Sequence, residues 1–233
     1  MIDIHTSRTQ DRLRQAALDL FLVNGYQSTS LRDLASSIGV HAGSLYNHIE
    51  NKQSLLFELI EECMDDLLNL TRRRLKRALP GQSRVHLFIQ AFIDFQAGDK
   101  KRLILLGREK NNLSKEQQQR IYNLRGDYLD CLKRVIHAEA GIPEREEIEL
   151  RFLASSVIGM LESFVLWDHS FQSLSNQEVV ERFTNMVARA ISPPREQRSH
   201  LPGNEPTRKS PASRQLPSPT RHYPQAGPPG RDG

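Results

Sequence analysis

The sequence has few of the features that mark membrane, secreted and zinc-binding proteins. No apolar run approaches the roughly 18–20 residues that a membrane-spanning helix needs. The first residues are not a basic segment followed by an apolar one, which argues against a secretory signal. Only two cysteines, Cys63 and Cys131, occur among 233 residues, and they form no CxxC pair. We therefore expect a cytoplasmic protein with no disulfide scaffold, no metal, no cofactor and no membrane partner.

The short motifs of common enzyme classes are also missing. None of the eight histidines lies in an HExxH or HxxxH pattern, and there is no GxSxG or Walker sequence. Glu162, in an apolar segment near Asp168 and His169, is the one polar group to weigh for acid–base or metal chemistry. A solvated or ligand-facing carboxylate is the simpler interpretation of Glu162. We expect that the protein is not an enzyme.

Proline is scarce before residue 193. Ten of the 12 prolines lie in Pro193–Gly233, where only five residues are apolar. Such a segment cannot bury enough apolar surface to offset its chain entropy, so we expect it to be disordered. It carries seven basic and three acidic residues, whereas residues 1–192 hold 25 of each. The net charge of +4 therefore belongs to the tail and is no evidence for a nucleic-acid-binding body.

Apolar residues in the body recur at helical spacing, and no segment has the alternation of a convincing strand. Asn24-Gly25, Gly39 and Pro80-Gly81 are typical helix ends, and Ser30, Ser114 and Ser175 begin capping boxes. The sequence therefore predicts an all-α fold of about nine helices. The expected segments are apolar stripes over 13–21 and 31–38, Ala42–His48, a long helix after Asn51, a stripe over 85–95 ended by Gly98, Lys101–Lys110, and helices that carry 121–136, 144–168 and 179–191.

The last two expected helices are unusually apolar. Over Glu144–Asp168 three separate lines of large apolar side chains run along the helix, so it must be covered nearly all round. We favour a second copy of the chain as the partner that covers these helices. The alternative is that both helices are central in the core of a single chain.

Residues Ser30–His48 have the layout of a helix-turn-helix. Two short helices flank Gly39, which supplies the turn. The second, Ala42–His48, would enter the major groove of DNA with its N-terminus first. Spacing alone leaves DNA binding and an ordinary pair of short helices equally favoured.

The residue types decide between these two interpretations. The stretch AALDLFLVNGYQSTSLRDLASSIGVHAGSLYNHIENKQSLL closely resembles the N-terminal DNA-binding domain of TetR-type (tetracycline-repressor-like) transcriptional regulators. About a dozen positions match in register over residues 8–56, including AALxLF, Gly25-Tyr26, Gly43-Ser44-Leu45-Tyr46 and Asn51-Lys52. The resemblance implies a helix-turn-helix domain over 1–54, a helical ligand-binding and dimerisation domain over 55–192, and the tail over 193–233.

The resemblance also assigns DNA contacts to individual residues. Phosphate contacts fall to Thr29, Ser30, Arg32, Tyr46, His48 and Lys52, and the reading of bases falls to His41, Ala42, Gly43, Ser44 and Asn47. Asn47 has the donor and acceptor that adenine requires, and Ala42 suits a thymine methyl group. The family usually has serine or a similar cap where this chain has His41, so we expect a poorly capped recognition helix.

The C-terminal half is less informative. An apolar pocket would be lined by Phe88, Phe92, Phe95, Leu105, Leu106, Phe152, Met160, Phe164 and Trp167, although a plain core is the simpler interpretation of each residue taken alone. The stretch LLGREKNNLSKEQQQRIYNLRGDYLDCL is similar, more weakly, to TetR-type regulators that respond to acyl-CoA thioesters. That similarity implies an apolar slot with a basic mouth, for which Arg102, Arg108 and Arg125 are candidates and solvated surface charge is the alternative. Other apolar drugs and aromatic acids fit the sequence as well.

Taken together, the sequence predicts a homodimeric, ligand-responsive regulator, most often a repressor, that binds a near-palindromic double-stranded operator. A small apolar or acyl-CoA-type effector would release it. The alternative is a ligand-independent, dimeric architectural protein of the same fold. A closed, fully packed C-terminal domain would favour that alternative, and a large apolar cavity would favour the sensor.

Overall fold

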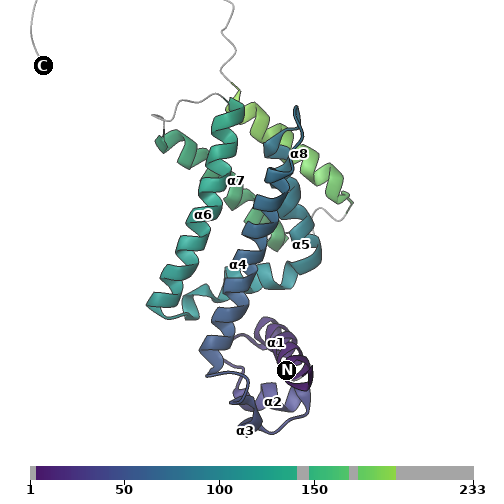
Figure 1. Cartoon of the computed structure of the whole chain (residues 1–233), viewed down its shortest axis with the longest axis vertical. Helices are drawn as coiled ribbons and strands as arrows, with labels where there is room; N and C mark the ends of the chain where they lie inside the picture. The colour runs from purple at the N-terminus through teal and green to yellow at the C-terminus, as the bar shows by residue number, and fades with distance from the viewer. Residues whose placement is uncertain (1–3, 141–146, 168–172, 193–233) are drawn as a thin grey trace, which may run out of the picture. The chain divides into compact units, whose positions relative to one another are not determined.

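The computed structural model describes residues 4–140, 147–167 and 173–192, and these residues are helical with no strand among them (Figure 1). The all-α prediction is therefore confirmed. The expected tail lies outside the described residues, as do Asp168 and His169. The elements are α1 (Ile4–Asn24), α2 (Leu31–Ile38), α3 (Ala42–Leu45), α4 (Lys52–Lys76), α5 (Arg84–Glu109), the 3-10 turn η1 (Lys110–Asn112), α6 (Lys115–Ala140), α7 (Glu147–Trp167) and α8 (Asn176–Ile191).

The described residues form eight α-helices where the sequence led us to expect about nine. The two segments expected on either side of Gly98 are one helix, α5, with a kink at Asp99 (φ −130°, ψ 30°). Glycine is a weak helix former, which permits the bend. The Arg102 guanidinium then holds it, because it donates to both Asp99 carboxylate oxygens at 3.0 and 2.7 Å and reaches Asp66 of α4 at 2.8 Å.

The recognition helix is shorter than expected. It was predicted over Ala42–His48, but α3 ends at Leu45. The His41 side chain makes no capping bond, so the helix begins weakly. The chain continues as tight turns, in which the amides of His48 and Ile49 donate to the Leu45 carbonyl at 2.8 and 2.9 Å.

The expected helix ends around this turn are confirmed. Ser30 and Asp33 form a reciprocal capping box at the start of α2, and Gly39 ends α2 in the left-handed region at φ 71°. Asn51 and Ser54 form a second box that starts α4. The segment between α2 and α4 is thus fixed by the left-handed backbone of Gly39 at one end and by the Asn51–Ser54 box at the other.

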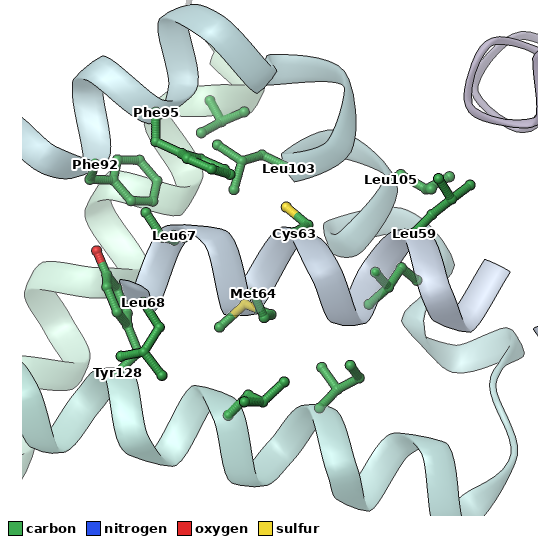
Figure 2. Close-up of a cluster of buried hydrophobic side chains, with 14 of the residues drawn as sticks. Leu59, Cys63, Met64, Leu67, Leu68, Phe92, Phe95, Leu103, Leu105 and Tyr128 are labelled. Carbon is green, nitrogen blue, oxygen red and sulfur yellow. The ribbon is translucent and has the colours of Figure 1, made fainter. Parts of the chain in front are cut away.

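The core is centred on α4 and α5. Helix α4 packs on α5 and α6, and α5 also packs on α7 and α8. Figure 2 shows the apolar side chains that fill the space between α4, α5 and α6. Cys63 is part of this core, and burial raises the pKa of its thiol to about 12, so it stays protonated and unreactive. None of the described helices is long and apolar enough to span a bilayer.

Helix α4 connects the N-terminal helices to the C-terminal ones (Figure 1). Its first turns lie against α1, where Arg14 pairs with Glu58 at 3.1 Å and also with Glu62. Its remaining turns lie in the C-terminal core. The proposed domain boundary between residues 54 and 55 falls within this helix, and it remains a prediction.

Candidate functional site

The helix-turn-helix has one buried and one exposed face. Leu34, Ile38, Leu45 and Ile49 are buried against α1 and its neighbours. Arg12 links α1 to the end of α2, because its guanidinium donates a hydrogen bond to the Ile38 carbonyl at 2.6 Å. The segment from His41 to Asn47 is therefore held at a fixed angle with its opposite side open to solvent.

The residues expected to read bases lie on this open side. His41, Gly43, Ser44 and Asn47 are exposed, and Ala42 is half-buried. A side chain that reads base edges must project from the protein surface into the groove, and the exposed His41, Ser44 and Asn47 suit that role. Ala42 is partly open on the same side, and Gly43 has no side chain to keep the backbone away from DNA.

The residues expected to bind phosphate fall into two groups. Arg32 and Tyr46 are exposed, Tyr46 with 62% of its surface accessible, and His48 is half-buried beside them. Thr29 is buried, and its hydroxyl donates to the Gly25 carbonyl at 2.9 Å. The Ser30 hydroxyl is engaged by Asp33 in the capping box.

Lys52 belongs to the second, inward group. Its ammonium donates to the carbonyls of Tyr26 at 2.9 Å and Thr29 at 2.8 Å, with Gln27 at 3.5 Å. It also lies 4.2 Å from the centre of the Tyr26 ring, which adds a cation–π contact. Burial lowers the pKa of Lys52. All three N–H groups therefore point into the loop between α1 and α2 in this conformation.

A polar junction joins the N-terminal helices to the end of α5 and to η1. Asn112 is its centre: its side chain accepts from Gln27 and donates to Glu109 at 2.7 Å, and its carbonyl accepts from Gln53 at 3.2 Å. Arg108 adds a bond to the Leu22 carbonyl at 3.2 Å. Movement of this part of α5 and η1 would therefore displace the end of α1 and the loop between α1 and α2, to which Lys52 is bonded.

A cavity of about 330 Å³ lies on the other side of the same segment of α5. It is mainly apolar and is enclosed by α4, α5, α6 and α7. Its lining residues are Met64, Leu67, Phe92, Leu103, Leu106, Gly107, Lys110, Ile121, Arg125, Tyr128, Gly159, Glu162, Ser163, Val165 and Leu166. Volume and composition suit a small apolar ligand with a polar end.

The cavity contains some of the residues expected from sequence and not others. Phe92 and Leu106 line it. Four of the expected residues do not line it. Phe88, Phe95 and Leu105 lie in the packed core, and Phe152 is exposed on the surface. Met160 and Phe164 line a separate apolar groove between α7 and α8, and the Trp167 side chain lies outside the described residues.

Of the three candidate arginines, only Arg125 reaches the cavity. It makes a two-pronged ion pair with Glu162 across α6 and α7, with 2.9 Å between one nitrogen and oxygen. Arg102 holds the kink of α5, and Arg108 holds the loop at Leu22. Lys110 of η1 and Tyr128 of α6 also line the cavity, and the sequence did not single them out. They are distant in sequence, and only the packing of the helices brings them to one cavity.

The groove between α7 and α8 is open and apolar. Met160, Phe164, Phe183 and Met186 are among its lining residues. Further along α7, Ile148 is 87% exposed and Phe152 63% exposed, one helical turn apart on the same face. Large apolar side chains gathered on one surface are typical of a protein–protein interface.

Comparison with known proteins identifies this architecture. The family model described as "Bacterial regulatory proteins, tetR family" matches residues 13–59, and the model "Tetracyclin repressor-like, C-terminal domain" matches residues 78–191. The two models together match more than half of the chain. The chain therefore belongs to the TetR family, and it is a helix-turn-helix transcriptional regulator, a class of DNA-binding proteins that are not enzymes.

Individual relatives agree with this assignment. The fatty acid metabolism regulator protein of Bacillus subtilis is 23% identical over 151 residues, which is 64% of this chain and 78% of the relative. Further curated repressors match over 83 or 84 residues, which is 41–45% of their own lengths.

Solved structures share the fold. A regulator of the tetR family from Rhodococcus RHA1 has a TM-score of 0.69 at 21% identity, with 79% of this chain and 97% of that chain covered. The AibR structure, a complex with isovaleryl coenzyme A and operator DNA, has a TM-score of 0.66 at 22% identity, with 76% and 97% covered.

Proposed function

We propose that the protein is a homodimeric repressor that binds a near-palindromic operator and leaves it when a small apolar or acyl-CoA-type effector fills the cavity between α4, α5, α6 and α7. The observation that carries this proposal is the position of that cavity. Leu106, Gly107 and Lys110 line it, while Arg108 and Asn112 of the same segment hold the N-terminal helices.

The acyl character of the effector is supported by the lining and by two relatives. The cavity is mainly apolar, with Lys110 and the Arg125–Glu162 pair as the charged groups at its wall, which leaves one net positive charge and suits a ligand with an apolar body and an anionic end. The Bacillus subtilis relative is named a regulator of fatty acid metabolism, and the AibR structure contains isovaleryl coenzyme A. The cavity also favours the sensor over the ligand-independent architectural protein, which would need no such space.

Dimerisation is supported by the exposed apolar side chains of α7 and α8. A second copy that covers Ile148, Phe152 and the groove at Phe164 would remove this surface from water. Two copies would present two α3 segments to half-sites about one helical turn apart, roughly 34–36 Å, or a multiple of that distance.

Contacts with DNA are proposed for the exposed residues. Arg32 and Tyr46, with His48, would contact phosphates, while His41, Ala42, Ser44 and Asn47 would meet base edges and Gly43 would let the backbone approach. Thr29, Ser30 and Lys52 would act mainly by holding the loop and the start of α2 in place.

Two binding experiments test the proposal. Selection from a random duplex library should return a near-palindrome, and Asn47→Ala should lose about 1–3 kcal/mol on the selected site with little change on random DNA. A panel of acyl-CoAs and apolar aromatic acids should then include compounds that release the operator. Selection of no common sequence would contradict the DNA-binding part, and release by no compound would favour the architectural alternative.

A further inference from the structure

The wall of the cavity contains a buried hydroxyl that none of the described residues pairs. Tyr128 of α6 is 2% exposed, and its phenolic oxygen has no hydrogen-bond partner among the described residues. The Thr71 hydroxyl lies nearby and favours the ionised phenol, but it donates its own proton to the Leu67 carbonyl at 2.8 Å, and the geometry between Thr71 and Tyr128 is not that of a hydrogen bond. The other buried side-chain oxygen without a partner, on Gln96, belongs to a residue that does not line the cavity.

Packing alone does not require this hydroxyl. The Tyr128 ring lies against Phe88, with 4.8 Å between ring centres, and phenylalanine would make the same contact. A buried hydroxyl without a partner is destabilising, so native proteins rarely keep one unless something pairs with it. Burial raises the pKa of Tyr128, so the group remains a neutral donor.

The hydroxyl lies in the wall of the cavity, and its oxygen has almost no surface that a water molecule can reach, so a ligand meets it only after a lining side chain shifts. Figure 2 shows it directed from α6 past Leu67 toward Phe92, and both of these residues line the cavity. Arg125 lies three residues earlier on the same face of α6 and is exposed, whereas Tyr128 is buried. A ligand that extends inward along this face of α6, from the Arg125–Glu162 pair, therefore reaches the part of the wall that contains Tyr128.

We propose that Tyr128 donates a hydrogen bond to an oxygen atom of the effector, so that the preferred effector is an oxygen-bearing acyl compound and not a plain hydrocarbon chain. This inference rests on the proposed function and specifies the chemistry of the same cavity. The acceptor is either the acyl carbonyl itself or a keto or hydroxyl oxygen further along the chain. A cavity of about 330 Å³ is roughly twice the size that takes up benzene, so it holds on the order of a dozen carbon atoms.

Three probes of matched length distinguish the two possible acceptor oxygens. Dodecyl-CoA thioether has no acyl carbonyl, dodecanoyl-CoA has one, and an oxododecanoyl-CoA has a second carbonyl along the chain. Their affinities for the full-length protein are measured by calorimetry, for the wild type, for Tyr128→Phe and for Tyr122→Phe. Tyr122 is the matched control, because it lies on the same helix with 61% of its surface exposed and does not line the cavity.

We expect Tyr128→Phe to lower the affinity about tenfold for the probe whose carbonyl accepts the Tyr128 hydrogen bond. The affinity for the thioether should stay the same or rise. Tyr122→Phe should change none of the affinities. Loss on dodecanoyl-CoA identifies the acyl carbonyl as the acceptor, and loss on the oxo compound alone identifies the second oxygen. Equal weakening of all three probes by Tyr128→Phe, or no weakening of any, would overturn the proposal.

A second measurement needs no ligand. If the hydroxyl is unpaired in the free protein, Tyr128→Phe should raise the melting temperature, while Tyr122→Phe should not. A lower melting temperature for Tyr128→Phe would show that the protein already pairs the hydroxyl and would contradict the inference. Binding of the probes without dependence on Tyr128 overturns the inference alone, and binding of none of them overturns both it and the acyl effector.

Discussion

Replacement of Lys52 by alanine separates a structural role from a role in DNA binding. Its ammonium makes two short bonds to the carbonyls of Tyr26 and Thr29 and lies over the Tyr26 ring. Hydrogen bonds to a charged group contribute about 1.5–3 kcal/mol when buried, and partial exposure of Lys52 reduces the total to about 1–2 kcal/mol. For a domain of this size, that loss lowers the melting temperature by roughly 2–8 °C.

Arg32 provides the matched comparison, because it is exposed near the same turn. We expect Arg32→Ala to keep the melting temperature and to reduce the slope of log affinity against log salt by about 1 for each protomer, as loss of one phosphate contact requires. We expect Lys52→Ala to lower the melting temperature and to change the salt slope little. Scanning calorimetry and fluorescence anisotropy at several salt concentrations measure the two quantities. A Lys52→Ala protein with unchanged stability and a slope reduced as much as that of Arg32→Ala would refute this reasoning.

Three further substitutions address the interface, the junction and the caps. Phe152→Glu should convert dimer to monomer in light scattering, because it places a charge on the apolar face of α7; an unchanged dimer would locate the interface elsewhere. Asn112→Ala removes the side-chain bonds to Gln27 and Glu109, so it should retain operator affinity but require more effector for release, whereas Asn111→Ala next to it should behave as wild type. Asp33→Asn should lower the melting temperature at pH 7, and this loss should shrink progressively as the pH falls below 3.8; a loss that stays constant down the acid range would contradict the capping role.

The pH dependence follows from the direction of the pKa shift. Bonds from the Ser30 side chain and backbone hold the pKa of Asp33 below its ordinary value of 3.8. A carboxylate with a lowered pKa stabilises the fold above its unfolded-state pKa, and the contribution is lost as the pH falls through the folded-state value. Ser175 lowers the pKa of Glu178 at the start of α8 in the same way, so unfolding by acid should begin below about pH 4.5, the ordinary value for glutamate.

Much of the fold was predictable because local signals decide it. Helical periodicity placed the elements, and the capping boxes at Ser30 and Ser175 fixed two of their starts within a residue. The kink at Asp99 was expected as a break at Gly98, since glycine weakens a helix but does not end it when Arg102 bridges the bend. The poor cap at His41 was expected from the sequence and is confirmed, whereas the early end of α3 at Leu45 was not expected.

The site was less predictable, because its residues depend on which surfaces face each other. Periodicity shows that Phe88 and Phe92 share a face of α5, but it does not show that Phe88 packs on Tyr128 while Phe92 borders a cavity. The inward orientation of Lys52 depends on the path of the loop after Gly25. The sequence motif marks Lys52 as a family position, and only the structure shows which atoms its ammonium meets.

The measurement that tests the central claim most directly is effector-driven release of the operator by the wild type and by Gly159→Leu. Gly159 lines the cavity from α7, and an added Cβ there meets no atom within 4 Å, so a side chain can be introduced at the cavity wall without displacing the backbone. Gly159 lies on the same face of α7 as Phe152, so light scattering must first show that the variant is still dimeric. The account predicts that an acyl compound releases the wild type, while Gly159→Leu binds the operator equally well and stays bound at the same effector concentration. Equal release of both proteins would show that the effector does not act through this cavity and would contradict the account.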